Sequence, residues 1–252
     1  TKASVWYFIR EMTAEKIREN FAILQTIAEG AAMMTDTSVS RRIIGAAYPR
    51  HFNKPIAEAM YENIRAVGMP EWSEDDQAFA HAFQEYMEAE EVVGLNTEIE
   101  ELQAPLEEPK SGGSDDIGDV SWNVPTVTLR FPSNIDGSTG HHWSSANAMA
   151  TPIAHKGATA GAKVVAATML DLIQQESLVD NAWTYFRDEQ SANETYVSFV
   201  GETDNPAIEK NAEIMNAYKD RLKDYYYDPS KYDTYLEQLG IDYPQLKDPD
   251  AE

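Results

Sequence analysis

The sequence contains no cysteine, which excludes disulfide bonds and any thiolate nucleophile or thiolate metal ligand. Basic residues are also few, 20 against 43 acidic residues, and the net charge of −23 opposes binding to nucleic acid or to an anionic membrane surface. No apolar run approaches the roughly eighteen residues that a membrane span needs. These absences predict a globular protein that binds neither nucleic acid nor membrane. They leave open whether the protein is cytoplasmic, or periplasmic or otherwise exported.

The sequence also lacks a start methionine and a signal peptide. Thr1 and Lys2 lead directly into Ala3–Arg10, a segment rich in β-branched and aromatic residues that is typical of a strand. We therefore expect the chain to begin within a longer protein.

The pattern of residues 1–50 predicts part of a small α/β layer, formed by a strand, a helix and a second strand. Behind Thr13, a partial cap, apolar residues recur with helical spacing at Ile17, Phe21, Leu24, Ala28 and Ala32. The segment Thr37–Ala47 then has the composition of the second strand.

Residues 51–176 predict a sheet flanked by helices, so the fold class is α/β. We expect helices at Pro55–Val67, Ser73–Val93 and Ile153–Gln174, a strand at Val124–Phe131, and loops at Asn96–Asp116 and Ser133–Thr151. Small residues recur along the third helix and predict close packing against the sheet. Residues 177–252 predict a helical extension with a tyrosine-rich tail that wraps onto the body.

Three of the five histidines, His141, His142 and His155, lie within fifteen positions. Imidazole nitrogen and carboxylate oxygen are the ligands of zinc sites, and either loop histidine, His141 or His142, suits that role. His155 opens a helix beside Lys156, where a structural hydrogen bond is favoured over catalysis. The sequence has no His-x-Asp and no His-Glu-x-x-His motif, so a metal bound here needs ligands from elsewhere.

The other candidate site residues keep two interpretations each on the residues alone. Asp115, Asp116 and Asp119 suit metal ligands, but they equally suit turn formers or caps. Arg10 follows the first strand and suits either a bidentate contact with a substrate carboxylate or an ordinary surface ion pair.

Five segments together resemble a known enzyme family. They are Ala3–Arg10, Ile27–Thr35, Ser114–Trp122 (Ser-Asp-Asp-Ile-Gly-Asp-Val-Ser-Trp), Gly140–Trp143 (Gly-His-His-Trp) and Ile153–Gly157 (Ile-Ala-His-Lys-Gly). The first two are similar to a late strand and a helix end of the lid domain, and the others are similar to catalytic-domain motifs. The chain therefore resembles the C-terminal half of the amidohydrolase-type dinuclear zinc peptidases, the aminoacylase and carboxypeptidase-like superfamily. Within it, the resemblance is greatest to the p-aminobenzoyl-glutamate hydrolase branch.

The resemblance implies a fold and a set of site residues. Residues 1–50 would be part of a lid, or dimerisation, domain, and residues 51–176 part of a zinc-peptidase catalytic domain. His141 matches the last metal ligand, and His142 stands in place of a serine at the substrate. Arg10 matches a lid arginine that holds a substrate carboxylate, and Asp116 and Asp119 match acidic positions that line the site. Two divalent ions, zinc or manganese, would be the cofactors.

The family's other metal ligands and its glutamate base lie in an N-terminal half that has no counterpart here. We therefore expect no catalytic residue in this chain, and a second polypeptide that carries the missing half. The implied activity is metal-dependent hydrolysis of an amide bond in an N-acyl amino acid, a dipeptide or an aryl-amide of an amino acid, by an enzyme that dimerises through its lid. The alternative is a non-catalytic subunit of the same fold that acts in assembly or ligand binding.

Overall fold

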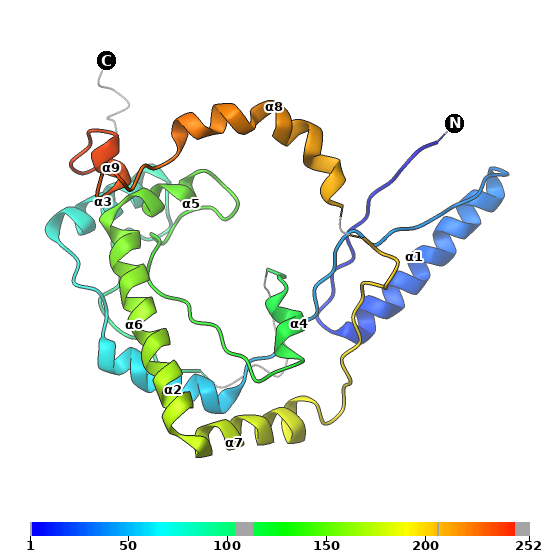
Figure 1. Cartoon of the computed structure of the whole chain (residues 1–252), viewed down its shortest axis with the longest axis horizontal. Coiled ribbons are helices and arrows are strands. Elements are labelled where there is room, and N and C mark those ends of the chain that lie inside the picture. Colours follow the sequence, from blue (N-terminus) through cyan, green and yellow to red (C-terminus); the bar gives the residue numbers. More distant parts are fainter. Residues whose placement is uncertain (1, 104–112, 206, 245–252) are drawn as a thin grey trace. The chain divides into compact units, whose positions relative to one another are not determined.

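The computed structural model describes residues 2–103, 113–205 and 207–244, and within them it consists of helices joined by irregular segments (Figure 1). The elements are α1 (Ala14–Met34), α2 (Lys54–Val67), α3 (Glu74–Tyr86), α4 (Ile117–Ser121), α5 (Ser144–Asn147), η1 (Ala148–Ala150), α6 (Pro152–Gln174), α7 (Glu176–Tyr185), the π-helical turn η2 (Phe186–Gln190), η3 (Ile208–Asn211), α8 (Ala212–Leu222), η4 (Lys223–Tyr225) and α9 (Tyr235–Gln238). None of the helices in these ranges is long and apolar enough to cross a lipid bilayer.

The chain divides into two compact units. Unit 1 comprises Thr1–Pro55, Gln103–Val127 and Asp180–Lys210, and unit 2 comprises Ile56–Leu102, Thr128–Val179 and Asn211–Glu252. The domain boundaries predicted from the sequence, after residues 50 and 176, stay a prediction.

The predicted α/β fold is wrong, because the described residues contain neither a strand nor a sheet. Ala3–Arg10, Thr37–Ala47 and Val124–Phe131 were predicted as strands, and each is irregular. β-Branched and aromatic residues favour extended backbone locally, but a strand forms only where a second segment pairs with its N–H and C=O groups. That pairing depends on contacts far apart in the sequence, which composition does not report.

The first of these segments, Ala3–Arg10, is not packed as a strand in a sheet would be. Trp6 and Phe8 are 61% and 89% exposed, although their side chains are of the kind that a sheet normally buries. The helix that follows is as predicted: Thr13 Oγ1 accepts a hydrogen bond from the backbone N–H of Lys16, and α1 runs from there to Met34. The structure thus confirms the predicted helix. The prediction succeeded because a helix forms its hydrogen bonds only between residues close along the chain.

The core of unit 1 is a group of aromatic rings around Tyr48. Tyr48 is 1% exposed, and its ring stacks on Phe199 with the ring centroids 4.9 Å apart. Trp122 and Tyr196 pack edge-on against the same ring at 5.6 Å and 5.0 Å. Each aromatic pair contributes about 1 kcal/mol beyond the area that it buries. Tyr48 therefore ties together three segments that lie far apart in the sequence.

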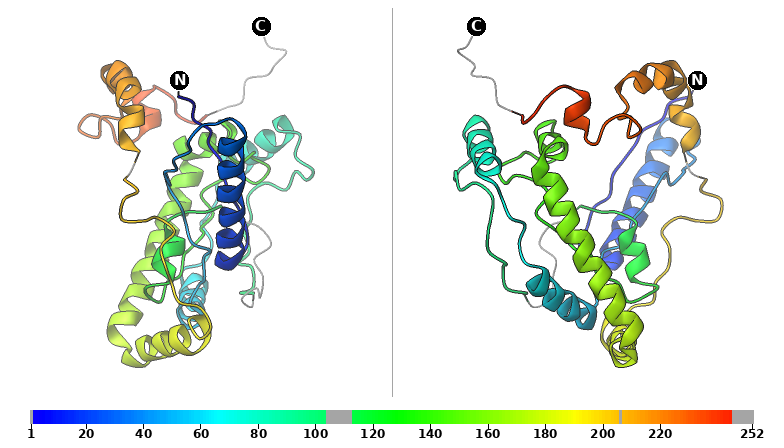
Figure 2. Two further views of the ribbon diagram at one scale, coloured as in Figure 1. Left: turned by 90° about the vertical axis from the view of Figure 1, so that its right-hand side faces the viewer. Right: turned by 60° about the vertical axis from the view of Figure 1, so that its left-hand side comes forward.

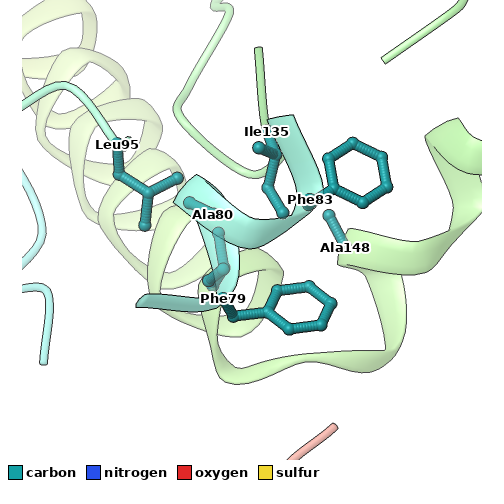
Figure 3. Packing of buried hydrophobic residues seen from close by; sticks show 7 residues of the cluster. Phe79, Ala80, Phe83, Leu95, Ile135 and Ala148 are labelled. Carbon is teal, nitrogen blue, oxygen red and sulfur yellow. The ribbon is translucent and has the colours of Figure 1, made fainter. Parts of the chain in front are cut away.

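The core of unit 2 is an apolar cluster centred on α3. Figure 3 shows the rings of Phe79 and Phe83, which project from α3 and lie beside Ala148. The buried members are Phe79, Ala80, Phe83, Leu95, Ile135, Ala148 and Ile153. Burying each of the larger side chains contributes about 2 kcal/mol, so this cluster fixes the segments around residues 135 and 148 against α3.

Helix α3 ends at Tyr86, whereas the sequence predicts a helix as far as Val93. The buried side chain of Gln84 explains the difference. Its Oε1 accepts hydrogen bonds from the backbone N–H groups of Val93 and Gly94, at 3.0 Å and 2.8 Å, and its Nε2 donates to the Gly94 carbonyl at 3.1 Å. The chain therefore turns back along α3 instead of extending it, through Glu88 at a φ of +52°.

Small residues let α6, the long green helix in Figure 2, approach its neighbour closely, as predicted. A Cβ atom on Gly157 would overlap with the Pro132 carbonyl, and one on Gly161 would lie 2.5 Å from the ring of Phe131. The surface against α6 is the irregular 131–133 segment and not the predicted sheet.

A fully buried carboxylate, Asp76, joins α3, α6 and the tail in unit 2. It accepts hydrogen bonds from the Ser73 backbone N–H at 2.8 Å, from Lys156 Nζ at 2.5 Å and from the Tyr243 hydroxyl at 2.7 Å. Burial, the largest influence, raises the pKa of Asp76, but together these bonds outweigh it and hold the pKa below the usual 3.8. Within the tail, Tyr243 thus contacts Asp76, whereas Tyr225 is 73% exposed, and the packing of the whole extension stays a prediction.

Replacing Asp76 with asparagine should lower the free energy of unfolding by about 3 kcal/mol at pH 7, because the Lys156 ammonium loses its buried partner. A carboxyl whose pKa is lowered by folding binds protons more readily in the unfolded chain. The natural protein should therefore lose stability as the pH falls through and below 3.8, and Asp76→Asn should lose this part of the acid dependence.

Urea unfolding at pH 6 and pH 3.5, followed by circular dichroism, measures both effects. Asp75→Asn is the matched control, since Asp75 is the exposed neighbour in the first turn of α3 and its replacement should cost only a few tenths of a kcal/mol. Equal losses in the two variants would contradict the role of Asp76.

Candidate functional site

The site residues predicted from the sequence fall in both units. Arg10, Asp116 and Asp119 belong to unit 1, whereas His141 and His142 belong to unit 2. The structure therefore brings the two histidines together as neighbours and places the two aspartates on and beside α4.

The loop that carries the two histidines is held at both ends. Ile135 and Ala148, each 1% exposed, anchor it in the core of unit 2. Within the loop, the Thr139 N–H donates to Ser144 Oγ at 3.3 Å, and the Ser145 hydroxyl donates to the Thr139 carbonyl at 2.6 Å. The backbone of the loop is therefore fixed, although the side chains at its tip are exposed.

His141 stands at the tip of this loop in a left-handed backbone conformation, with a φ of +56°. Few residues other than glycine adopt it, and it costs on the order of 1 kcal/mol. Its side chain is exposed, and in the part of the chain that the structure describes it forms no hydrogen bond or ion pair. Both nitrogens of this imidazole are therefore available to a ligand.

His142 differs from His141, because Ser144 determines its tautomer. The Nδ1 atom of His142 accepts a hydrogen bond from the Ser144 backbone N–H at 3.3 Å and lies 2.9 Å from Ser144 Oγ. A ring nitrogen that accepts carries no proton, so neutral His142 has its proton on Nε2. In this tautomer His142 offers an N–H donor and no free lone pair, which leaves His141 as the better metal ligand of the two.

Asp119 uses both of its carboxylate oxygens inside unit 1. Oδ2 accepts a hydrogen bond from the Tyr48 backbone N–H at 3.0 Å, and Oδ1 accepts one from the Tyr196 hydroxyl at 2.8 Å. Burial, followed by the bond to Asp119, raises the pKa of Tyr196. In this structure Asp119 fastens two members of the aromatic core.

Asp116 and Arg10 remain open to solvent. Asp116 occupies the N-cap position of α4, but its side chain makes no capping bond, and it is exposed. Arg10 is also exposed, and it has no ion pair among residues 2–103, 113–205 and 207–244. The neighbouring Asp115 instead pairs with Arg50, with Nη1 and Oδ2 3.6 Å apart.

The Gly-Asp-Val-Ser-Trp motif at 118–122 forms a seat for the segment 48–51. A Cβ atom on Gly118 would overlap with the Tyr48 carbonyl, so only glycine fits. Ser121 Oγ accepts a hydrogen bond from the His51 N–H at 3.2 Å, and Trp122 Nε1 donates to the Pro49 carbonyl at 2.7 Å. With the Asp119 bond, four of the five motif residues contact this segment.

Sequence reasoning missed two groups that belong to this seat. The Tyr48 hydroxyl accepts a hydrogen bond from Arg18 and donates one to Glu194, both at 2.7 Å. His51 lies against Trp122 and Tyr185, where burial lowers its pKa. The sequence shows aromatic and aspartate residues near Tyr48 and His51. Such residues do not specify hydrogen-bond partners of Tyr48 that lie 30 and 146 positions away.

Metal binding by this part of the chain alone is not favoured. Among the described residues, no group of three or more histidine and carboxylate side chains is arranged to hold an ion. Catalytic zinc is normally held by three protein ligands. The described residues therefore do not fit a resident metal by themselves.

An open hollow of about 610 Å³ lies in unit 2 between the turn after α2 and α6. Its lining includes Gly68, Glu71, His155, Thr159 and Lys163. The Lys156 ammonium at its edge is already engaged by Asp76 and by the Glu71 carbonyl. Neither loop histidine, His141 or His142, lines this hollow.

Replacing Gly118 with alanine should lower the free energy of unfolding by about 3 kcal/mol, because the added methyl group meets a backbone carbonyl that has no room to move. Gly113→Ala is the control, since no atom lies within 4 Å of its Cβ position. Thermal and urea unfolding compare the two variants. A similar, small loss of unfolding free energy in both variants would contradict the close contact between Gly118 and the Tyr48 carbonyl.

The backbone strain at His141 predicts that His141→Gly is more stable than His141→Ala by about 1 kcal/mol, because only glycine adopts a φ of +56° readily. His155 lies in the first turns of α6, so the order of the same two substitutions should reverse there, with alanine the more stable. Urea unfolding of the four variants checks both signs. The same order at both positions would show that His141 is unstrained.

Comparison with curated proteins gives a relative among the hydrolases. Over 200 residues, 71% of this chain, the sequence is 30% identical to a subunit of the p-aminobenzoyl-glutamate hydrolase of Escherichia coli (strain K12). The chain spans 42% of the length of that protein. No protein-family profile matches the chain, and no solved structure matches it. The predicted resemblance to this branch is confirmed, and the chain is related to a hydrolase subunit.

Proposed function

We propose that the chain is the C-terminal portion of a metal-dependent amidohydrolase or peptidase whose site is completed by a second polypeptide. The single observation that carries this proposal is the similarity to a hydrolase subunit over 71% of the chain but only 42% of that relative. The part of the relative outside the match is large enough to carry the remaining metal ligands and the glutamate base. A second polypeptide of that kind would supply them here.

His141 is proposed to contribute one bond to a divalent ion, zinc or manganese, in a site for two such ions. Its exposed imidazole, which forms no hydrogen bond with the residues that the structure describes, supports this role, and the tautomer of His142 disfavours the alternative assignment. The ions would polarise the scissile carbonyl and activate water. This chain would position the ligand and contribute no general base.

The other predicted residues are proposed to bind the substrate. The Nε2–H of His142 suits a carbonyl or carboxylate oxygen, and the exposed guanidinium of Arg10 suits a bidentate contact with a carboxylate. Asp116 is open to solvent, whereas Asp119 would act through Tyr48 and Tyr196, which it fastens. The relative is named for p-aminobenzoyl-glutamate, and the proposed substrates are N-acyl amino acids, dipeptides and aryl-amides of amino acids.

A homodimer formed through residues 1–50 belongs to the same proposal. The exposed side chains of Val5, Trp6 and Phe8 support it, because apolar side chains of this size are usually covered.

A non-catalytic subunit that acts in assembly or ligand binding is the second candidate. Two observations favour it: both oxygens of Asp119 are used by the fold, and no metal-binding cluster occurs in the described ranges. The two candidates differ in whether the native protein carries a metal and a catalytic partner.

The test is purification of the native protein, followed by intact mass, metal analysis and assay with p-aminobenzoyl-glutamate. The enzyme proposal expects a co-purifying polypeptide with His-x-Asp and Glu-Glu motifs, bound metal, and hydrolysis by the complex. A lone 28.2 kDa chain without metal or hydrolysis would overturn it in favour of the second candidate.

Within such a complex, His141→Ala should release about one metal equivalent and abolish most hydrolysis, because removal of a ligand weakens metal affinity directly. His142→Ala is the matched control at the next position, and it should keep the metal while lowering kcat/KM. Metal content by mass spectrometry and steady-state kinetics separate the two. If His142→Ala loses the metal and His141→Ala keeps it, the assignment is off by one residue.

A further inference from the structure

We infer that the open hollow beside α6 binds a phosphate monoester of a small organic molecule. This hollow, of about 610 Å³, lies within unit 2 between the turn at 67–71 and the N-terminal half of α6. The inference goes beyond the proposed hydrolase activity and does not depend on it. Neither His141 nor His142 lines the hollow.

Two lysines lie on the face of α6 that lines the hollow. From Lys156 onward, the lining residues of this helix recur at i, i+3, i+4 and i+7, which is the spacing of one helix face. They are Lys156, Thr159, Ala160 and Lys163. Seven residues span about 10 Å along a helix, and long helical side chains lean back towards its N-terminus. The ammonium group of Lys163 can therefore approach that of Lys156 around one bound anion.

The buried Asp76 fixes the first of these lysines at the hollow. Lys156 Nζ donates to Asp76 Oδ2 at 2.5 Å and to the Glu71 carbonyl at 2.9 Å. An ammonium group has three N–H donors, so one of them remains for a ligand. Because Asp76 is fully buried, it holds the lysine side chain in place, and this lowers the entropy lost when a ligand binds.

Lys163 supplies the positive charge that Lys156 shares with Asp76. Its side chain is exposed, and it forms no ion pair or hydrogen bond with the residues that the structure describes. His155, exposed in the first turn of α6, adds an imidazole N–H. A phosphate monoester carries about −1.5 to −2 charge at pH 7 and has three terminal oxygens. It therefore suits three donors, two of them ammonium groups, better than a carboxylate does.

The turn after α2 gives the hollow an apolar part. Val67, Met69 and Pro70 are half-buried members of its lining. A hollow of this volume has the size of a small-molecule site and exceeds what a free phosphate ion fills. An organic group attached to the phosphate would cover these apolar side chains. The lining therefore favours a monoester over inorganic phosphate.

Two negative charges oppose an anion in this hollow, and they give the inference a test of sign. The carboxylate of Glu71 belongs to the lining, and the whole chain carries a net charge of −23. Both repel a phosphate, so removal of the Glu71 charge should strengthen binding. Because salt screens exposed charges, binding should also weaken as the ionic strength rises.

The experiment measures binding of three probes to the full chain at pH 7.5 by isothermal titration calorimetry and ligand-observed NMR. Phenyl phosphate should bind saturably. Inorganic phosphate lacks the ring, and phenyl sulfate has the same shape with only one negative charge. Each of these two should bind about 3- to 10-fold more weakly than phenyl phosphate.

Four variants test the named side chains with phenyl phosphate. Lys163→Gln should weaken binding about 3- to 10-fold, as expected for one charge-assisted hydrogen bond at an exposed position, and Lys163→Arg should keep most of it. Glu71→Gln should strengthen binding about 2- to 5-fold, because it removes a repelling charge. Lys219→Gln is the matched control, since Lys219 is an exposed lysine of α8 that does not line the hollow. It should leave the affinity unchanged.

Circular dichroism shows that each variant is folded, and Lys163→Arg serves if Lys163→Gln is not. Absence of saturable binding of phenyl phosphate would overturn the inference. Equal losses in Lys163→Gln and Lys219→Gln would also overturn it, because they would reveal an effect of net charge alone. Equal affinities for phenyl phosphate and inorganic phosphate would exclude the organic monoester as the specific occupant.

Discussion

Side chains satisfy the backbone of the irregular segments, and both units depend on this constraint. An unpaired N–H group costs free energy when buried, and the described residues contain no sheet in which it could be paired. In unit 1 Asp119 and Ser121 accept from the backbone of the 48–51 segment. In unit 2 Gln84 and Gln77 do the same for residues 93–95. These polar side chains replace a neighbouring strand.

Because polar side chains take this structural role, a carboxylate that the sequence offers as a site residue can already be used by the fold. Asp119 suits a substrate-binding role by resemblance, yet both of its oxygens are occupied within the fold. Asp76 was not a candidate at all, yet it is fully buried and bonded to three different residues. A group that the fold already uses reaches a substrate only through the residues that it positions, whereas Asp116 keeps its carboxylate in solvent.

The sequence predicts what depends on neighbours along the chain and fails where distant contacts decide. Thr13 and its helix, and the long helix α6, follow from caps, period and composition, and both are confirmed. The strands were wrong because pairing is non-local. The end of α3 was missed because it depends on Gln84, whose amide role no local pattern reveals. The left-handed backbone of His141 was also unpredictable, since it follows from the loop between two core anchors.

His141 is exposed and is not used by the part of the fold that the structure describes. Its backbone is strained, at a φ of +56°, and its loop is anchored in the core of unit 2 by Ile135 and Ala148. Strain and exposure of this kind persist only where the surrounding structure imposes them, and they concentrate at ligand sites. A single free imidazole is too few ligands for a metal. The loop therefore presents an imidazole that the described part of the fold does not use, and this imidazole would bind a metal only together with ligands from elsewhere.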